Sequence, residues 1–577
     1  MTDRGLGTSI SNEQNAQAES LRNQLMSSDS AAIPSGSAAE PWMEQPRGNA
    51  GDGGRGDSEY LAVPNTPVKV GARIDLKALT IPLVIFAGAL AARLFVLFVV
   101  TDPQNPGLGW YGDVYHHWQI AYLSQEVGFS EGFLRLWDFK GLEFFWGLLH
   151  PLTLIALFNL TGSIDIVIPR LVSAVFGAVS VTFLFLLLRR HFGFGVAFAG
   201  ALLAGFNPIS IYSDSVGMQE PLGLALLLGG LLLIDKRPVF TGIAWALAGM
   251  VRAEYWVFGA GLLLVAVISR RYRDQRIPLA LGWAVPTLLY MKYMLDYTGN
   301  PIYPIYWNFL AGTAGRWMED VILNPEQLAV QLAARVVLLV SLVAAGWVLW
   351  KRPKAKLLLL LGLGNIIMLG IVLGLGKYIN GYITRVLVDR LLSLPYGYIG
   401  IFFAIALLYV LPRYAPRRTS MVFGWAAIIA VFGVAQLAWK PLLDYYDPLR
   451  VIWERESELA DEVAVHYQGG TISIPEDRQA LTYALARFHG VEGENLDGQM
   501  YDPFAYFSGD PFANWDENRQ AIRAWLIDRN ITLIVFYRGK ANYEQMVSRE
   551  PGWFEQVGST YGDAILIYQV RQSGGGS

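Results

Sequence analysis

Long apolar segments recur through the middle of the chain, separated by short polar stretches. A transmembrane helix needs about 20 mostly apolar residues, and the pattern predicts about eleven of them. They are expected at 77–100, 168–188, 194–212, 219–234, 238–251, 255–269, 277–295, 332–350, 355–376, 391–411 and 419–438. The sequence therefore predicts a polytopic α-helical membrane protein whose transmembrane domain covers residues 73–439.

The two ends of the chain lack this pattern. Residues 1–72 are rich in Ser, Gly, Asn, Gln and Pro and contain few large apolar side chains. Such a segment cannot bury enough surface to offset the entropy lost on ordering, so we expect it to be disordered. It also lacks the apolar core behind a basic start that marks a cleavable signal peptide. Residues 572–577 are expected to form a flexible tail.

Residues 440–571 are expected to form a separate domain. Short, continuously apolar runs bounded by turn residues are typical of buried strands. Their alternation with segments of helical spacing favours a small layered α/β domain. Strands are expected at 471–474, 531–536 and 564–568, and helices at 475–489 and 517–529.

One further apolar stretch, 142–160, decides the topology, because it carries Glu143, His150 and Pro151. Cytoplasmic loops carry an excess of Lys and Arg. If 142–160 does not cross and the N-terminus is cytoplasmic, all five basic clusters are cytoplasmic. We therefore expect a re-entrant or in-plane segment within a long first external loop, 101–167, and an extracytoplasmic C-terminal domain. The clusters are at 189–190, 236–237, 270–276, 351–356 and 413–418.

The composition supports a membrane protein and excludes several other classes. Hydrophobic residues make up 53% of the chain and charged residues 16%, whereas an average soluble domain is about 25% charged. The net charge of −3 gives no basic field that would attract nucleic acid. The sequence has no cysteine, which excludes a disulfide framework and a thiolate metal site.

The most informative polar stretch, residues 112–118, follows the first apolar segment and contains Asp113, His116 and His117. Ionisable residues at the edge of the hydrocarbon indicate a functional site. Asp113 is interpreted as the N-cap of an interfacial helix, as a general base, or as both. His116 and His117 would point about 100° apart on that helix, so only one can share a face with Asp113. An Asp-x-x-His pair could hold a divalent metal, but a third ligand is not evident.

Four more charged positions fall on the external side in this topology. Lys140 is either a snorkelling interfacial lysine or a phosphate contact. Glu220 precedes Pro221 and a run of leucines, where an acid either interacts with the helix dipole or faces a polar cavity. Arg252 and Glu254 interrupt an apolar stretch, and they either pair within a turn or line the same external vestibule as Asp113.

Two late arginines, Arg385 and Arg390, precede a span that contains Pro395. Their external position runs against the positive-inside bias, which suggests a function. A planar guanidinium is well suited to bind phosphate oxygens through two hydrogen bonds. The alternative is that one of the two arginines forms an ion pair with Asp389.

The order of these positions resembles that of the GT-C glycosyltransferases, such as protein O-mannosyltransferases and the aminoarabinose transferases of lipid A. Members carry an acid in the first external loop and a Lys before an aromatic in-plane segment. An Arg-Leu opens the second span, an acid precedes the fourth, and basic residues precede a late Pro-containing span. The matching residues are Asp113, Lys140, Arg170, Leu171, Glu220, Arg385 and Arg390, and the resemblance covers 77 to about 412.

The resemblance implies a GT-C-like fold, with in-plane helices in the first external loop, in a prokaryotic plasma membrane. It implies an inverting transfer of a hexose or pentose from a polyprenyl-phosphate donor to a protein, lipid or glycan acceptor. Asp113 would be the general base, Lys140 and Arg385 would hold the lipid phosphate, and Glu220 would orient substrate. The expected substrate-binding set also includes Arg252, Glu254, Arg390, His116 and His117.

The resemblance also bears on metal dependence. Oligosaccharyltransferase-like members of the fold class use a metal and an Asp-x-Asp pair. The external loops contain no such pair, so we expect a metal-independent mechanism without a cofactor.

Two other functions are compatible with a polytopic chain. A transporter or lipid flippase often has internal repeats and charges near mid-membrane. Here no repeat is visible and the charges cluster at one face. A non-catalytic membrane scaffold would leave Asp113 and the external arginines unexplained.

Overall fold

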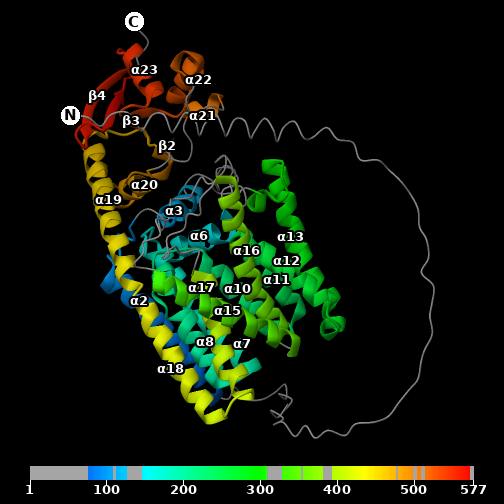
Figure 1. Ribbon diagram of the computed structural model, residues 1–577. Coiled ribbons are helices and arrows are strands. Elements are labelled where there is room, and N and C mark those ends of the chain that lie inside the picture. The colour runs from blue at the N-terminus through cyan, green and yellow to red at the C-terminus, as the bar shows by residue number, and fades with distance from the viewer. Residues whose placement is uncertain are drawn as a thin grey trace. The chain divides into compact units, whose positions relative to one another are not determined.

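The computed structural model describes residues 76–107, 112–125, 146–306, 308, 328–351, 355–380, 393–475, 478–497, 503–508 and 514–571. Each of the eleven predicted segments contains a helix, and the segment 194–212 is interrupted at 206–207 (Figure 1). The corresponding helices are α2 (Leu76–Phe95), α7 (Val167–Phe192), α8 (Phe194–Gly205) with α9 (Pro208–Ser215), α10 (Glu220–Leu233), α11 (Pro238–Gly249), α12 (Ala253–Ile268), α13 (Arg276–Thr298), α15 (Leu328–Lys351), α16 (Lys356–Asn380), α17 (Ser393–Ile405) and α18 (Arg417–Gln436).

Several of these helices are short or bent. In the described part of the chain, four helices are long and apolar enough to cross a membrane, or up to six if each bent pair counts as one span. The bent pairs are α8 with α9, at 60°, and α12 with the helix that begins at Arg270, at 106°. The number of eleven spans and the charge-based topology stay predictions.

The bend between α8 and α9 has a local cause in the sequence. Asn207 is the N-cap of α9, and its side-chain oxygen accepts a hydrogen bond from the Ser210 backbone nitrogen at 2.9 Å. Pro208 occupies the first helical position, where a missing N–H costs nothing. Helix α8 therefore ends before Asn207, and a separate helix, α9, starts at Pro208.

A core of buried apolar side chains joins α7, α8, α10, α12 and α17. Helix α7 packs against α2, α8 and α10, and α11 packs against α13. A second core is built from α3 (Asp113–Leu123), α6 (Leu149–Thr161) and parts of the C-terminal region. Helix α6 has 13 residues, about 20 Å at 1.5 Å per residue. It is therefore shorter than the hydrocarbon core of about 30 Å.

The C-terminal region contains a five-stranded mixed sheet in the order β2-β1-β3-β5-β4. Strands β2, β1 and β3 are parallel, whereas β5 pairs antiparallel with both β3 and β4. Helix α22 packs on β3, and α19 packs on α20 and β4. The elements are α19 (Trp439–His466), β1 (Thr471–Ser473), α20 (Gln479–His489), β2 (Leu496–Asp497), α21 (Pro503–Ser508), α22 (Trp515–Asp528), β3 (Ile531–Tyr537), α23 (Ala541–Arg549), β4 (Phe554–Thr560) and β5 (Ile565–Val570).

The predicted strands and helices of this region are confirmed as β1, β3, β5, α20 and α22, but the sequence analysis missed α19. Helix α19 follows α18 so closely that Arg417–His466 forms one helical stretch of 50 residues (Figure 1). The α/β interpretation is therefore correct, and a long charged helix connects that sheet to the apolar helices.

Candidate functional site

Helix α3 carries the first candidate residue. The helix begins at Asp113 itself, its N-cap is Gly112, and no side chain caps it. The interpretation of Asp113 as the N-cap is therefore wrong, because the residue occupies the first helical position. Asp113 is half-buried. Asp113 is the acidic residue in the first turn of α3.

The two candidate histidines contact a second aromatic segment at the start of α6. The His116 ring is 5.2 Å from the Trp146 ring, and the His117 ring is 4.9 Å from both the Trp146 and the His150 rings. His117 is buried, whereas His116 is half-buried. As expected from helix geometry, the two histidines therefore face different surroundings.

His150 was not among the predicted site residues, although its place in an apolar segment was a signal. It is fully buried, and neither ring nitrogen has a hydrogen-bond partner among the described residues. Burial lowers the pKa of His150 to about 3, so its imidazole is neutral. A buried polar group with no partner is rare and costs roughly 1–3 kcal/mol.

Glu220, Arg252 and Glu254 form one ionic cluster. Arg252 Nη1 donates to Glu220 Oε1 at 2.6 Å, and Nη2 and Nε donate to the two Glu254 oxygens at 2.6 and 3.0 Å. The side chains are 9%, 15% and 26% exposed in the order Arg252, Glu220, Glu254. The Tyr255 hydroxyl donates to the Glu220 backbone oxygen at 2.8 Å. The expected Arg252–Glu254 pair exists, and Glu220 joins it from α10.

Glycines bring these segments into contact. A Cβ at Gly217 would lie 2.5 Å from Val114 Cγ2, so the backbone leading to Glu220 packs directly on the residue that follows Asp113. Gly147 similarly packs on the Met250 carbonyl oxygen, which accepts a hydrogen bond from the Leu149 nitrogen at 2.9 Å. Both glycines have positive φ, at +99° and +110°. Helix α3, the start of α6, and the loops before Glu220 and Arg252 therefore meet.

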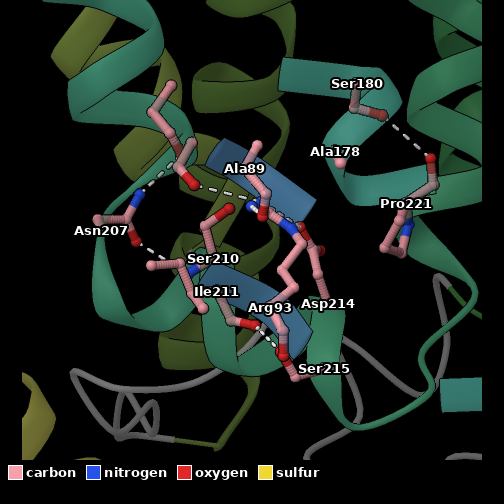
Figure 2. Close-up of polar contacts among 12 residues, drawn as sticks. Ala89, Arg93, Ala178, Ser180, Asn207, Ser210, Ile211, Asp214, Ser215 and Pro221 are labelled. Carbon is pink, nitrogen blue, oxygen red and sulfur yellow. Dashed lines mark hydrogen bonds and ion pairs between the residues drawn. The ribbon is translucent and has the colours of Figure 1, made fainter. Parts of the chain in front are cut away.

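A second ionic cluster, which the sequence analysis missed, joins α2 to α9 (Figure 2). Arg93 is fully buried, and its Nε and Nη2 donate to Asp214 Oδ2 at 2.8 and 2.6 Å. Its Nη1 and Nη2 also donate to the carbonyl oxygens of Ala89 and Gly205, at 3.0 and 3.2 Å. A lone arginine within an apolar segment was the available signal, because such residues are paired when buried.

Arg170, the residue expected to open the second span, differs from Arg93 and Arg252 because carbonyl and hydroxyl oxygens, not carboxylates, accept its hydrogen bonds. It is fully buried, and its hydrogen bonds go to neutral acceptors. Its donors reach the carbonyl oxygens of Ser215, Asp102 and Pro103 at 3.0, 2.5 and 2.8 Å, and the Thr101 hydroxyl at 2.6 Å. Arg170 therefore ties residues 101–103, which follow the first apolar helix, to the end of α9.

Lys140, Arg385 and Arg390 lie outside the described residues, so their proposed phosphate contacts stay predictions. Within the described part of the chain, no group of three His, Asp or Glu side chains could hold a metal ion. The expectation of a metal-independent mechanism also stays a prediction.

No protein-family model matches the chain, and no curated protein matches it either. Among solved structures, the chain is similar to ArnT from Cupriavidus metallidurans bound to undecaprenyl phosphate. The sequence identity is 13% and the TM-score 0.48, and the match covers 86% of this chain and 99% of that one. The structure of ArnT in the apo state gives 13% identity and a TM-score of 0.45, over 85% of this chain and 98% of that chain.

The archaeal oligosaccharyltransferase AglB from Archaeoglobus fulgidus, in complex with an inhibitory peptide and a dolichol-phosphate, is also similar. The identity is 11% and the TM-score 0.41, over 79% of this chain and 69% of that chain. The aminoarabinose transferase ArnT, a member of one of the families named from the sequence, and an oligosaccharyltransferase are thus among the structures found. Because every TM-score is below 0.5, the activity has to be argued from the site itself.

Proposed function

We propose that this chain is a membrane glycosyltransferase that transfers a sugar from a polyprenyl-phosphate donor to a protein, lipid or glycan acceptor on the extracytoplasmic side. The observation that carries the proposal is the packing of Gly217 on Val114. It brings the helix that starts at Asp113 against the loop that leads to Glu220. Two acids that are 107 positions apart in the sequence thus belong to neighbouring backbone segments.

In this proposal Asp113 is the general base. Its carboxylate takes the proton from an acceptor hydroxyl or amine, and the acceptor atom forms the new bond to the anomeric carbon. The bond between that carbon and the phosphate oxygen breaks, and its electron pair goes to the phosphate. Attack from the face opposite the phosphate inverts the anomeric carbon. Asp113 lies half-buried in the first turn of α3.

The phosphate that leaves needs fixed cations, and Arg252 is a poor candidate for that role. All three of its nitrogens already bind carboxylate oxygens of Glu220 and Glu254. We therefore assign the phosphate to Lys140, Arg385 and Arg390, because preorganised cations stabilise developing charge well in a water-poor site. We assign the Glu220–Arg252–Glu254 cluster, together with His116 and His117, to binding polar groups of the sugar or the acceptor.

The test is to delete the gene, find by mass spectrometry the glycan that is lost, and restore it with variants. Wild-type protein should restore the glycan, whereas Asp113→Asn should reduce its rate of formation at least 100-fold, since a general base contributes roughly 10²–10⁴. Asp296→Asn is the matched control, because Asp296 is an exposed acid paired with Lys292. Affinity for undecaprenyl phosphate, measured by thermal shift, should be unchanged in Asp113→Asn.

Full activity of Asp113→Asn would exclude the base assignment. If no glycan is lost on deletion, and the purified protein instead moves fluorescent undecaprenyl phosphate between leaflets of a vesicle, the transfer function is wrong and the flippase alternative is correct.

A further inference from the structure

The C-terminal region contacts the segment that carries Asp113 in two places. The first contact is on the loop before α3. The Tyr446 hydroxyl in α19 donates to the Asn105 carbonyl oxygen at 2.8 Å and accepts from the Asp102 nitrogen at 3.1 Å. Asn105 Nδ2 donates to the Arg450 carbonyl oxygen at 3.2 Å. Helix α19 thus holds the chain a few residues before the catalytic candidate.

The second contact is on α3 itself, and it is made of rings. Tyr115 stacks on Trp453 of α19, with ring centres 5.2 Å apart and planes 25° apart. Tyr483 of α20 lies 5.7 Å from Tyr115 and meets Trp118 edge-on at 4.9 Å. All four rings are buried. Aromatic pairs at these spacings contribute about 0.5–1.5 kcal/mol each beyond the burial of their area.

The Tyr483 hydroxyl makes two hydrogen bonds that join both ends of the first external loop. It donates to Gln104 Oε1 at 2.7 Å and accepts from the Ile166 backbone nitrogen at 3.2 Å. The Gln104 side chain in turn donates to Asp165 at 2.8 Å. Burial raises the pKa of Tyr483, so the hydroxyl keeps its proton and remains a donor.

We infer that Tyr483 is a positioning residue for the reaction, because it fixes α3, and with it Asp113, from the C-terminal domain. The inference rests on the proposed function of Asp113 as the base. A base works only within hydrogen-bond reach of the proton that it takes. A displacement of about 1 Å can reduce a rate about 100-fold. Tyr483 makes three contacts that determine where α3 lies. Its ring packs on the aromatic face of α3, and its hydroxyl binds Gln104 in the loop before α3 and Ile166, the residue before α7.

The experiment compares Tyr483→Phe, Tyr483→Ala and a matched control, Tyr568→Phe, in the full-length protein. Tyr568 is a tyrosine of the same domain whose hydroxyl donates to the exposed Gln556 side chain at 3.2 Å. Three quantities are measured: the rate of glycan formation in the deletion strain, the affinity for undecaprenyl phosphate, and hydrogen–deuterium exchange of peptides covering 113–123. Asp113→Asn is included as the reference without a base.

We expect Tyr483→Ala to reduce the transfer rate at least 30-fold and to speed exchange in 113–123 about tenfold, with undecaprenyl phosphate affinity within twofold of wild type. Tyr483→Phe keeps the rings and loses the two hydrogen bonds, so the rate should fall only three- to tenfold. Tyr568→Phe should behave as wild type. A transfer rate that is lowest in Tyr483→Ala, intermediate in Tyr483→Phe and highest in wild type, at constant affinity for undecaprenyl phosphate, supports a positioning role. A general loss of structure would lower the affinity as well.

Wild-type transfer by Tyr483→Ala, beside an inactive Asp113→Asn, would overturn the inference and leave the proposed function intact. Equal loss of transfer and of undecaprenyl phosphate affinity in Tyr483→Phe would overturn it too, since that pattern indicates general unfolding. An active Asp113→Asn would refute the proposed function. Unchanged hydrogen–deuterium exchange of 113–123 in Tyr483→Ala would separately refute the claim that Tyr483 holds α3 in place.

Discussion

Arg93 and Arg252 are both buried and both bound by carboxylates, but their surroundings differ in charge balance. Arg93 has one acid, Asp214, and its remaining contacts are backbone carbonyl oxygens. Arg252 has two acids, Glu220 and Glu254, which are 15% and 26% exposed. The first cluster thus has one acid at a fully buried arginine, whereas the second has two partly exposed acids.

The difference separates a structural ion pair from a candidate binding site. A buried pair holds its elements together chiefly because removing one partner leaves an uncompensated charge. The Arg93–Asp214 pair holds α9 against α2 at the bend that follows α8. Because Glu220 and Glu254 are partly exposed, their carboxylate oxygens can be reached by a hydroxyl or a cationic group of a substrate. Substitutions in the first cluster should therefore affect stability, and those in the second should affect transfer.

The largest effect on stability is expected from Asp214→Leu, because it leaves the Arg93 guanidinium buried without an anion. We expect a loss of about 3–5 kcal/mol in the free energy of unfolding, measured by thermal unfolding in detergent. The double variant Arg93→Met with Asp214→Leu should recover most of this loss. If Asp214→Leu unfolds at the wild-type temperature, the pair does not stabilise the protein.

Gly177→Ala tests the same cluster from the neighbouring helix. A Cβ at Gly177 would lie 2.3 Å from Asp214 Oδ2 and 2.6 Å from Arg93 Nε. Overpacking of this kind costs typically about 1–3 kcal/mol. The control is Gly346→Ala in α15, where a Cβ would meet nothing within 4 Å, and helix propensity predicts a gain of up to about 1 kcal/mol. Equal unfolding temperatures for the two variants would contradict the close approach.

Glu254→Gln should show the reverse pattern. Because the pair is partly exposed, the free energy of unfolding should fall by about 1 kcal/mol or less. The rate of glycan formation should fall about tenfold if this carboxylate binds substrate through a charged hydrogen bond of roughly 1.5–3 kcal/mol. Glu454→Gln, which removes one acid of an exposed pair with Arg450, is the control. A stable variant with unchanged transfer would remove Glu254 from the site.

The smallest effect is expected from His150, a buried polar group set among apolar and aromatic side chains. Its pKa is about 3 in the folded protein and about 6.5 in the unfolded chain, so below pH 6.5 the unfolded chain binds a proton that the folded chain does not. The contribution of His150 to stability therefore falls as the pH drops from 6.5 towards 3. Relative to His150→Leu, wild type should lose about 1 kcal/mol between about pH 7 and 5.5. Parallel pH profiles of the two proteins would contradict the lowered pKa.

Sequence periodicity was sufficient to predict the apolar helices and the strands β1, β3 and β5, because these depend on local patterns of burial, but it missed the two-residue strand β2. It failed for α19, whose sequence alternates charged and apolar residues and has one buried face, and for β4, in which one of seven residues is buried. The formation of α19 and β4 depends on contacts with other elements and not on a local pattern of burial. Helix α19 packs on α20 and β4, and β4 pairs with β5.

The candidate site was predictable only in part. Charged residues at the ends of apolar segments led to Asp113, Glu220, Arg252 and Glu254, and the structure joins the last three. The pairing of Arg93 with Asp214 could not be predicted, because the partners are 121 positions apart and the bend at Asn207 determines which way Asp214 faces. Tyr483 carried no sequence signal, since nothing in its own segment indicates the loop that it contacts.

The helical stretch Arg417–His466, in which two turn residues separate α18 from α19, has a consequence for movement of the C-terminal region. Its 50 residues correspond to about 75 Å at 1.5 Å per residue, so a tilt of about 3° at one end would move the other end by about 4 Å. The rotation of each side chain about the helix axis matters as much as the length of the stretch. One residue inserted between α18 and Tyr446 would rotate everything beyond it by about 100°, which would turn Tyr446 and Trp453 away from the loop and the helix that they hold. The number of residues between α18 and these two rings must therefore stay constant. A substitution in this segment leaves that number unchanged, whereas an insertion alters it.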